Sequence, residues 1–332
     1  MLAATTTASI GSPLLWGVFL SVLLLILALD LGVFHRKEHV IGTREAAAWT
    51  GTWVGLSLAF GTWVWWRFGS QVGLEFFTGY LIEYALSVDN IFVFIVVFSY
   101  FAVPAKYQHR VLFWGILGAL VMRGVFIALG AALISRFDWV LYIFGAFLVF
   151  TGIKILVQRE TEVHPERNPV VNLFRRLVPL TNRYHEKRFF VREGGRLMAT
   201  PLLLVLAVVE ATDVVFAVDS IPAIFGITRD PFIVFTSNIC AILGLRSLYF
   251  LLAGILLKFI YLKFGLGLVL AFIGLKMLAA DLVHLPVQVS LGVVVAILGG
   301  SIVASLLWPP PPDALPEPPE PPFEHPGELP PG

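Results

Sequence analysis

Carboxylates lie within two of the most apolar stretches of this chain, at matching positions. The first stretch, EYALSVDNIFVF, begins at Glu83, and the second, EATDVVFAVDSIPAIF, begins at Glu210. Alignment of SVDNI with AVDSI pairs Asp89 with Asp219, and Glu83 with Asp213 six residues earlier in each copy. Because a carboxylate is costly in an apolar membrane segment, such residues usually mark an ion or proton path. We therefore predict a cation site between two repeats, with Glu83, Asp89, Glu210, Asp213 and Asp219 as metal ligands.

The expected ligand set is almost entirely oxygen. Asn90, Thr212, Ser220 and Asn238 lie on or near the acidic segments and are predicted helpers. No cysteine or histidine accompanies them, and oxygen-only sites suit hard divalent cations such as Mn²⁺, Ca²⁺ or Mg²⁺ rather than Zn²⁺ or Cu⁺. This chemistry does not choose among the three hard cations.

Two arginines occupy matching positions in apolar runs. Arg123 lies in GALVMRGVF and Arg246 in AILGLRSLYF. We expect both to be counter-charges, since a nearby cation keeps a carboxylate ionised.

Helical geometry restricts how the acids can meet. Six residues turn an ideal helix by about 240° beyond one full turn, so Glu83 and Asp89 point about 120° apart, as do Asp213 and Asp219. They converge on one ion only if the helix unwinds or bends nearby. Pro222, which removes a backbone donor, makes such a break plausible in the second copy.

Composition places the chain in the membrane. Its 332 residues are 58% hydrophobic and 14% charged, with a mean hydropathy of +0.86, whereas a soluble domain carries about 25% charged residues. Apolar runs near the roughly 20 residues that span a bilayer occur at 14–34, 47–66, 76–101, 110–133, 139–157, 199–225, 232–256, 263–281 and 286–307. The predicted fold is an all-α polytopic membrane protein with about nine transmembrane helices.

The similarity between the two acidic segments extends over three runs each. AFLVFTGIKIL around Lys154 resembles AFIGLKMLAADL around Lys276. Three spans is an odd number, so the second unit is expected to be inverted relative to the first. The predicted organisation is an N-terminus at 1–13, peripheral spans at 14–70, repeat 1 at 75–157, a basic loop at 158–198, repeat 2 at 199–282, a last span at 286–307 and a disordered, acidic, proline-rich tail at 308–332.

The positive charges predict the orientation. With the N-terminus outside, the inner connections carry sixteen Lys and Arg, nine of them in the 158–198 loop, against only Arg67, Arg136 and Arg229 outside. Cytoplasmic loops are the basic ones, so we predict a multi-pass protein of the cell membrane with an outer N-terminus and a cytoplasmic C-terminus. The basic loop is expected to attract anionic headgroups of the lipid bilayer.

Several segments together resemble one known family. ALDLGVFHR, EYALSVDNIFVF and the long stretch from Val208 through Phe250 closely resemble the TerC/Alx family of membrane proteins, over residues 14–307. The resemblance implies a Mn²⁺ exporter related to the LysE-like folds with inverted three-helix repeats. It also implies that Glu83, Asp89, Glu210, Asp213 and Asp219 bind Mn²⁺ as the transported substrate.

We predict a secondary transporter that exports Mn²⁺ from the cytoplasm, with protons as the exchanged ion. No P-loop or dinucleotide fingerprint is present, so we expect neither enzymatic activity nor an organic cofactor. We also expect no nucleic-acid partner. Two alternatives remain open: a Ca²⁺/H⁺ exchanger or cation channel of the same architecture, and a non-transporting scaffold. The scaffold would assist insertion or metalation of exported proteins, binding its protein partner through the basic loop or the tail.

Overall fold

The computed structural model describes residues 9–33, 42–157, 169–181, 183–185, 188–193, 195–252, 261–283 and 285–308. The tail beyond residue 308, the first eight residues and the first part of the basic loop, all subjects of predictions above, lie outside the described residues. The described elements are α1 (Pro13–Val33), α2 (Thr43–Phe68), α3 (Ser70–Tyr100), α4 (Ala105–Arg136), α5 (Val140–Val157), α6 (Pro169–Leu177), β1 (Phe190–Glu193), β2 (Arg196–Ala199), α7 (Pro201–Phe225), α8 (Pro231–Leu243), α9 (Leu245–Leu252), α10 (Leu262–Leu278) and α11 (Val287–Leu307).

The protein is a helical membrane protein, as its hydropathy predicts. Among the described residues, α3, α4, α5, α7 and α11 are long and apolar enough to cross a bilayer, and the bent pair α8–α9 makes a sixth span if counted as one. Eight of the nine predicted apolar runs each fall on one helix, and the described part of the run 232–256 falls on two. The count of nine spans and the inverted repeat nevertheless stay predictions.

The run expected as one helix over 232–256 is broken. α8 ends at Leu243 and α9 begins at Leu245, with a bend of 41° between them. Glycine is a weak helix former and a common site of kinks. A Cβ atom at Gly244 would lie 3.2 Å from the Cβ atom of Trp53 in α2. The close approach of α2 therefore accounts for the glycine at the bend.

The acidic helices are continuous, so the expectation of unwinding beside the acids is wrong. α3 is helical without interruption through Glu83 and Asp89, and α7 continues past Pro222 to Phe225. Pro222 lies within the last turn of α7, where a missing backbone donor costs the helix least. The 120° offset between the paired acids on each helix therefore persists.

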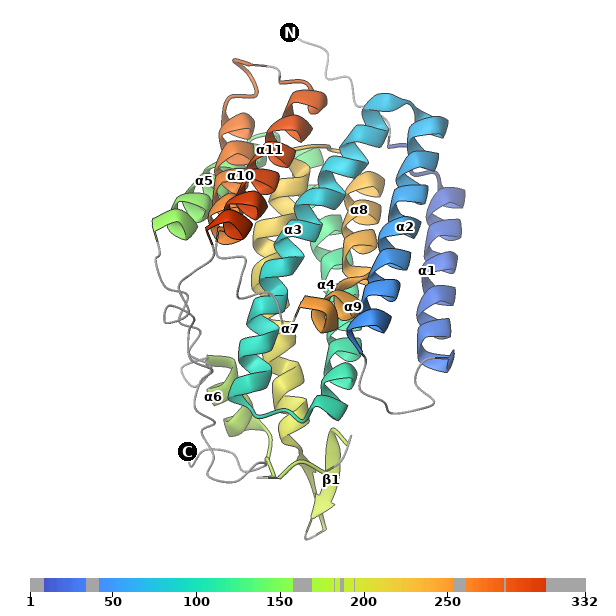
Figure 1. Cartoon of the computed structure of the whole chain (residues 1–332), viewed down its shortest axis with the longest axis vertical. Helices are drawn as coiled ribbons and strands as arrows, with labels where there is room; N and C mark the ends of the chain where they lie inside the picture. Colours follow the sequence, from blue (N-terminus) through green and yellow to red (C-terminus); the bar gives the residue numbers. More distant parts are fainter. Residues whose placement is uncertain are drawn as a thin grey trace.

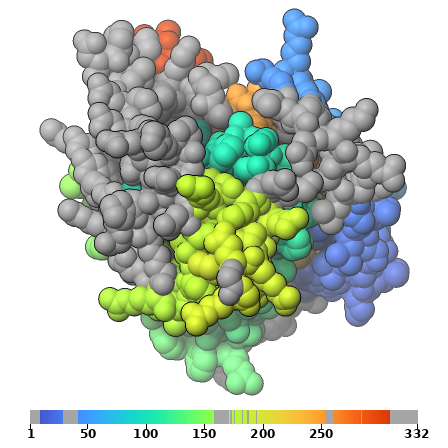
Figure 2. Space-filling model, turned by 90° about the horizontal axis from the view of Figure 1, so that it is seen from below, coloured from blue at the N-terminus to red at the C-terminus, as the bar shows by residue number. Residues whose placement is uncertain are grey.

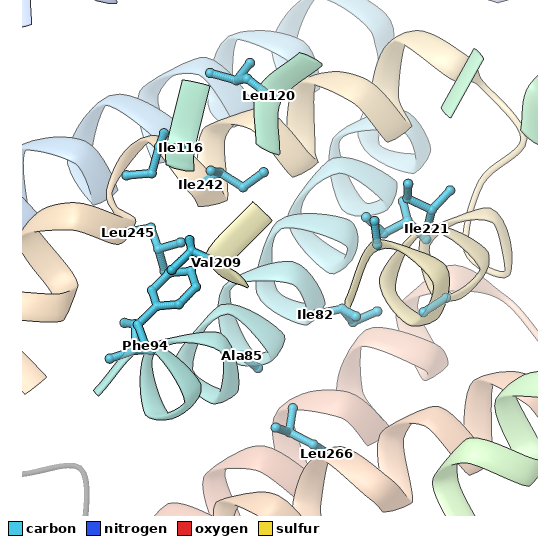
Figure 3. Packing of buried hydrophobic residues seen from close by; sticks show 14 of the residues in the cluster. Ile82, Ala85, Phe94, Ile116, Leu120, Val209, Ile221, Ile242, Leu245 and Leu266 are labelled. Atoms are coloured by element: carbon cyan, nitrogen blue, oxygen red, sulfur yellow. The ribbon is translucent and has the colours of Figure 1, made fainter. Parts of the chain in front are cut away.

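The helices are arranged around a core made by α3 and α7. Figure 1 shows α1 and α2 at one edge, α5, α10 and α11 at the other, and the remaining long helices between them. α3 packs on α8, α7 packs on α4, and α3 and α7 contact each other. Buried side chains from all four fill the centre, including Ile82 and Phe94 of α3, Ile116 of α4, Val209 of α7 and Ile242 of α8 (Figure 3).

α5 and α10 pack antiparallel at the distance that only glycine permits. A Cβ atom at Gly152 would lie 2.6 Å from the backbone oxygen of Gly267, and one at Gly274 would lie 2.6 Å from that of Gly145. Backbone atoms cannot move aside as side chains can. The end of α5 therefore lies directly beside the start of α10.

Hydrogen bonds connect the segments at each end of the helices. At one end, Asp230 accepts from the Ser9 hydroxyl and the Ile10 amide, and Arg229 pairs with Asp138 at 3.4 Å. These segments are the ones predicted to lie outside. At the other end, the Tyr184 hydroxyl donates to the carbonyl of Phe101 at 2.6 Å, and burial raises its pKa so that it stays a donor.

The basic loop contains more structure than the sequence indicated. Its described part contains the amphipathic helix α6, with the sequence PVVNLFRRL. The antiparallel hairpin of β1 and β2, with Gly195 at φ +79°, was not expected. Figure 2 views this end of the molecule, with α6 and the hairpin near its centre.

Candidate cation site

A buried ion-pair network joins four helices. Arg123 of α4 contacts the carboxylate of Glu83 in α3 through Nη1, and its Nη2 donates to Asp213 Oδ1 of α7 at 3.1 Å. Asn238 of α8 donates from Nδ2 to Glu83 Oε2 at 2.9 Å. The side chains of Arg123, Glu83 and Asp213 are 1%, 0% and 4% exposed. Two carboxylates thus share one guanidinium, which leaves the network one negative charge in excess when all three are ionised.

Asp89 and Asp219 line a small cavity that adjoins this network through Arg123. The cavity, of about 50 Å³, lies between α3 and α7 and is also lined by residues of α5 and α10. That is enough for a water molecule, which needs roughly 10–15 Å³. Its polar lining comes from Asp89, Asn90, Arg123, Asp219, Ser220 and Lys263.

The cavity contains a polar group without a partner. The side-chain nitrogen of Asn90 is buried and has no hydrogen-bond partner among the described atoms. Such groups are rare in folded proteins and call for a ligand, a water or an amide turned the other way. If the Asn90 amide turns, it presents an oxygen to the cavity beside Asp89.

Three further predicted residues lie away from the cavity. The half-buried Glu210 of α7 packs against α4 at Gly118. Its carboxylate occupies the space that a side chain at Gly118 would need. The Thr212 hydroxyl donates to the carbonyl of Val208 at 2.7 Å. Arg246, half-buried on α9, does not line the cavity.

The structure therefore divides the five acids among three surroundings. Glu83 and Asp213 contact Arg123, Asp89 and Asp219 face the cavity, and Glu210 lies at the α4–α7 contact. Within the described residues, no three carboxylate, histidine or cysteine side chains are close enough to hold one metal ion. The division follows from the continuous helices, since residues six apart face different directions. The metal role of each acid stays a prediction.

Sequence reasoning missed one lining residue. Lys263 was counted only as an inner loop charge, yet it lies at the start of α10 and lines the cavity. No spacing relates it to either acidic segment. Lys263 stands three residues before Leu266, at the start of an apolar run whose sequence resembles the run that contains Lys154. This was the only sequence signal for its position.

Comparison with known proteins gives a consistent picture. The model of a family described as integral membrane protein TerC matches residues 68–310. A membrane protein of Myxococcus xanthus, STKORF319, is 56% identical over 91% of this chain and 95% of its own length. An Escherichia coli K12 protein, whose name proposes a membrane-bound redox modulator, Alx, is 52% identical over 87% of this chain and 93% of its own. A Rickettsia bellii membrane protein is 40% identical over 88% and 97%. No solved structure matches.

Proposed function

The chain belongs to the TerC family of integral membrane proteins, and we propose that it exports Mn²⁺ from the cytoplasm in exchange for protons. The observation that carries this proposal is the cavity in which Asp89 of α3 and Asp219 of α7 meet. These two residues occupy equivalent positions of the sequence repeat. Paired carboxylates inside a membrane protein are costly unless a cation or protons compensate them.

The donors around the cavity suit a hard cation. Asp89, Asp219 and Ser220 offer oxygen, and Asn90 does so after its amide turns. Small hard cations retain part of their water shell in protein sites, so four protein donors suffice. The choice of Mn²⁺ over Ca²⁺ rests on the family resemblance of the acidic motifs.

The network around Arg123 has a different role in this proposal. Because Arg123 holds Glu83 and Asp213, these two acids bind the metal only in a second conformation in which Arg123 releases them. In the present conformation they fix α3, α4 and α7 around the cavity. Their excess negative charge also favours a cation at the neighbouring Asp89 and Asp219.

The packing of α5 on α10 supports the inverted repeat. Alignment of Lys154 with Lys276 makes Gly152 equivalent to Gly274, and Gly145 to Gly267. The contact of Gly145 with Gly274 and the contact of Gly152 with Gly267 are then equivalent, because each joins the same two positions of the repeat. Likewise the packing of α3 on α8 corresponds to that of α7 on α4. Inverted repeats with a site between them are typical of secondary transporters.

Export needs an energy source. Each charge moved against the membrane potential costs about 2.3 kcal/mol per 100 mV, so a divalent cation costs roughly 4.6 kcal/mol. Exchange for two protons cancels the transferred charge and leaves the pH gradient as the driving force. Carboxylates that repel one another take up protons when the metal leaves, and metal binding expels them.

The redox role in the name of the Escherichia coli relative finds no support here. The chain has a single cysteine, Cys240, which is buried in α8. An internal dithiol pair is therefore excluded.

The test is Mn²⁺ uptake into inside-out vesicles that contain the purified protein, with an acidic lumen. We expect gradient-driven uptake by the wild type and at least a tenfold loss, about 1.4 kcal/mol in barrier, in Asp89→Asn and Asp219→Asn. Asp138→Asn, an exposed carboxylate outside the helices, is the matched control and should transport normally.

Other outcomes favour the alternatives. Wild-type flux in either aspartate variant excludes the site. Uptake that ignores the pH gradient indicates a channel, and uptake inhibited by Ca²⁺ indicates a Ca²⁺ exchanger. If the folded protein takes up no Mn²⁺, the scaffold alternative is favoured. The activity of the scaffold should then be lost when the 158–198 loop is replaced.

A further inference from the structure

The carboxylates of the cavity each have a lysine as electrostatic partner. Lys263 of α10 lines the cavity together with Asp89, and Lys154 of α5, next to the lining residue Ile155, is close enough to Asp219 for their charges to interact. Both lysines lie where α5 and α10 pack antiparallel through Gly152 and Gly267. The helix ends that carry them are therefore side by side at the edge of the cavity.

The charges around the cavity balance without a metal ion. Asp89 and Asp219 carry two negative charges, and Lys154 and Lys263 carry two positive charges. Arg123, the other cation at the cavity, is already committed to Glu83 and Asp213. A divalent cation that entered with both lysines in place would add two positive charges in a region of low dielectric constant, and the one excess negative charge of the Arg123 network would offset only one of them.

The two lysines are less constrained by their surroundings than Arg123 is. Lys154 is exposed and Lys263 is half-buried, and both lie near helix ends, so neither ammonium group is enclosed by protein. A lysine stem has four carbons and can extend along an apolar surface while its charge stays in water. The Arg123 side chain is 1% exposed and contacts two buried acids.

We propose that the ammonium groups of Lys263 and Lys154 are tethered counter-cations that neutralise Asp89 and Asp219 once these acids have released their protons, and that they withdraw as one divalent cation enters. The inference rests on the proposed cation site and adds how that site is regulated. One divalent charge replaces two single charges, so the cavity stays neutral through the exchange. The returning lysines then compete with the bound metal and promote its release.

The experiment measures Mn²⁺ binding to the full-length protein in detergent by titration calorimetry. Removal of a competing cation should tighten binding, so we expect the Kd of Lys263→Met to fall on the order of tenfold, about 1.4 kcal/mol. Lys154→Met should act in the same direction. Lys263→Arg, which keeps a charge, should bind Mn²⁺ nearly as the wild type does.

Lys276→Met is the matched control. Lys276 lies on the same helix as Lys263 and is the repeat equivalent of Lys154, but its electrostatic partner is Glu75. Its substitution should leave the Kd unchanged. A second readout is acetylation of Lys263 by an amine reagent, measured by peptide mass spectrometry, which Mn²⁺ should accelerate.

The outcomes separate this inference from the function on which it rests. Absence of Mn²⁺ binding to the wild type overturns both. Binding that is lost in Asp89→Asn but unchanged or weakened in Lys263→Met overturns the counter-cation role alone. Acetylation of Lys263 that is indifferent to Mn²⁺ also overturns it.

Discussion

Arg123 is the residue that decides what two of the predicted metal ligands can do. Its guanidinium is fully buried and contacts the carboxylates of Glu83 and Asp213 from two other helices. The reason is geometric: a guanidinium presents several donors in one plane, so it can serve two acids at once. A metal ion cannot take these acids while Arg123 holds them.

Removal of the arginine charge should destabilise the protein. Arg123→Gln leaves two buried carboxylates without a counter-charge, and breaking a buried pair in this way costs about 3–5 kcal/mol. We expect a clear fall in the unfolding temperature in detergent. Arg136→Gln, at the exposed end of the same helix, should melt as the wild type does.

A neutral network should restore much of this loss. In the triple variant Arg123→Gln, Glu83→Gln, Asp213→Asn no buried charge remains, and such replacements are often close to neutral. If Arg123→Gln alone already melts like the wild type, the network does not hold the helices together.

At the scale of elements, the contact between α5 and α10 positions one side of the cavity. Ile155 of α5 and Leu266 of α10 line it, just beyond the contact of Gly152 with Gly267. Without side chains at these glycines the backbones of the two helices approach closely, as in other tightly packed membrane helices. The lysines near the cavity depend on the same contact.

An alanine at either central glycine should separate the two helices. In Gly152→Ala the new methyl group would meet the backbone of Gly267 and Ala271, and in Gly274→Ala it would meet the backbone of Gly145 and Val149. Overpacking of this kind typically costs 1–3 kcal/mol, which thermal unfolding in detergent measures. Gly292→Ala in α11, where no atom lies within 4 Å of the new methyl group, should be neutral or slightly stabilising. If Gly152→Ala or Gly274→Ala unfolded at the same temperature as Gly292→Ala, this result would contradict the close contact between α5 and α10.

At the scale of the whole molecule, the contacts between end segments fix which loops share a side. The chain before α1 and the α4–α5 connection both contact the segment that precedes α8. The basic loop contacts the α3–α4 connection at the opposite end. The bias of Lys and Arg then predicts that the basic end faces the cytoplasm.

Site-specific labelling tests this orientation. In a background with Cys240→Ala, a membrane-impermeant maleimide should label Asp138→Cys in intact cells. Arg192→Cys, in the hairpin of the basic loop, should be labelled only in inside-out vesicles. Both positions are exposed, so labelling of both from the same side would refute the predicted topology.

The class of the protein, the positions of most helices and the identity of the acids in the apolar segments could be read from the order of the amino acids alone. Helices form from local hydrogen bonds, and hydropathy is a sum over neighbours, so both are readable along the chain. The matching positions of Asp89 and Asp219 were visible for the same reason.

Which acids lie together depends on how the helices pack, and the sequence does not specify this. Glu83 pairs with Arg123 of another helix, and Asp89 shares its cavity with Asp219 of another helix. Both arrangements depend on which faces of the helices pack together. The approach of Trp53 to the bend at Gly244 and the place of Lys263 at the cavity are likewise contacts between distant segments. Such contacts leave no periodicity in the sequence, since they depend on how helix surfaces fit together rather than on spacing along the chain.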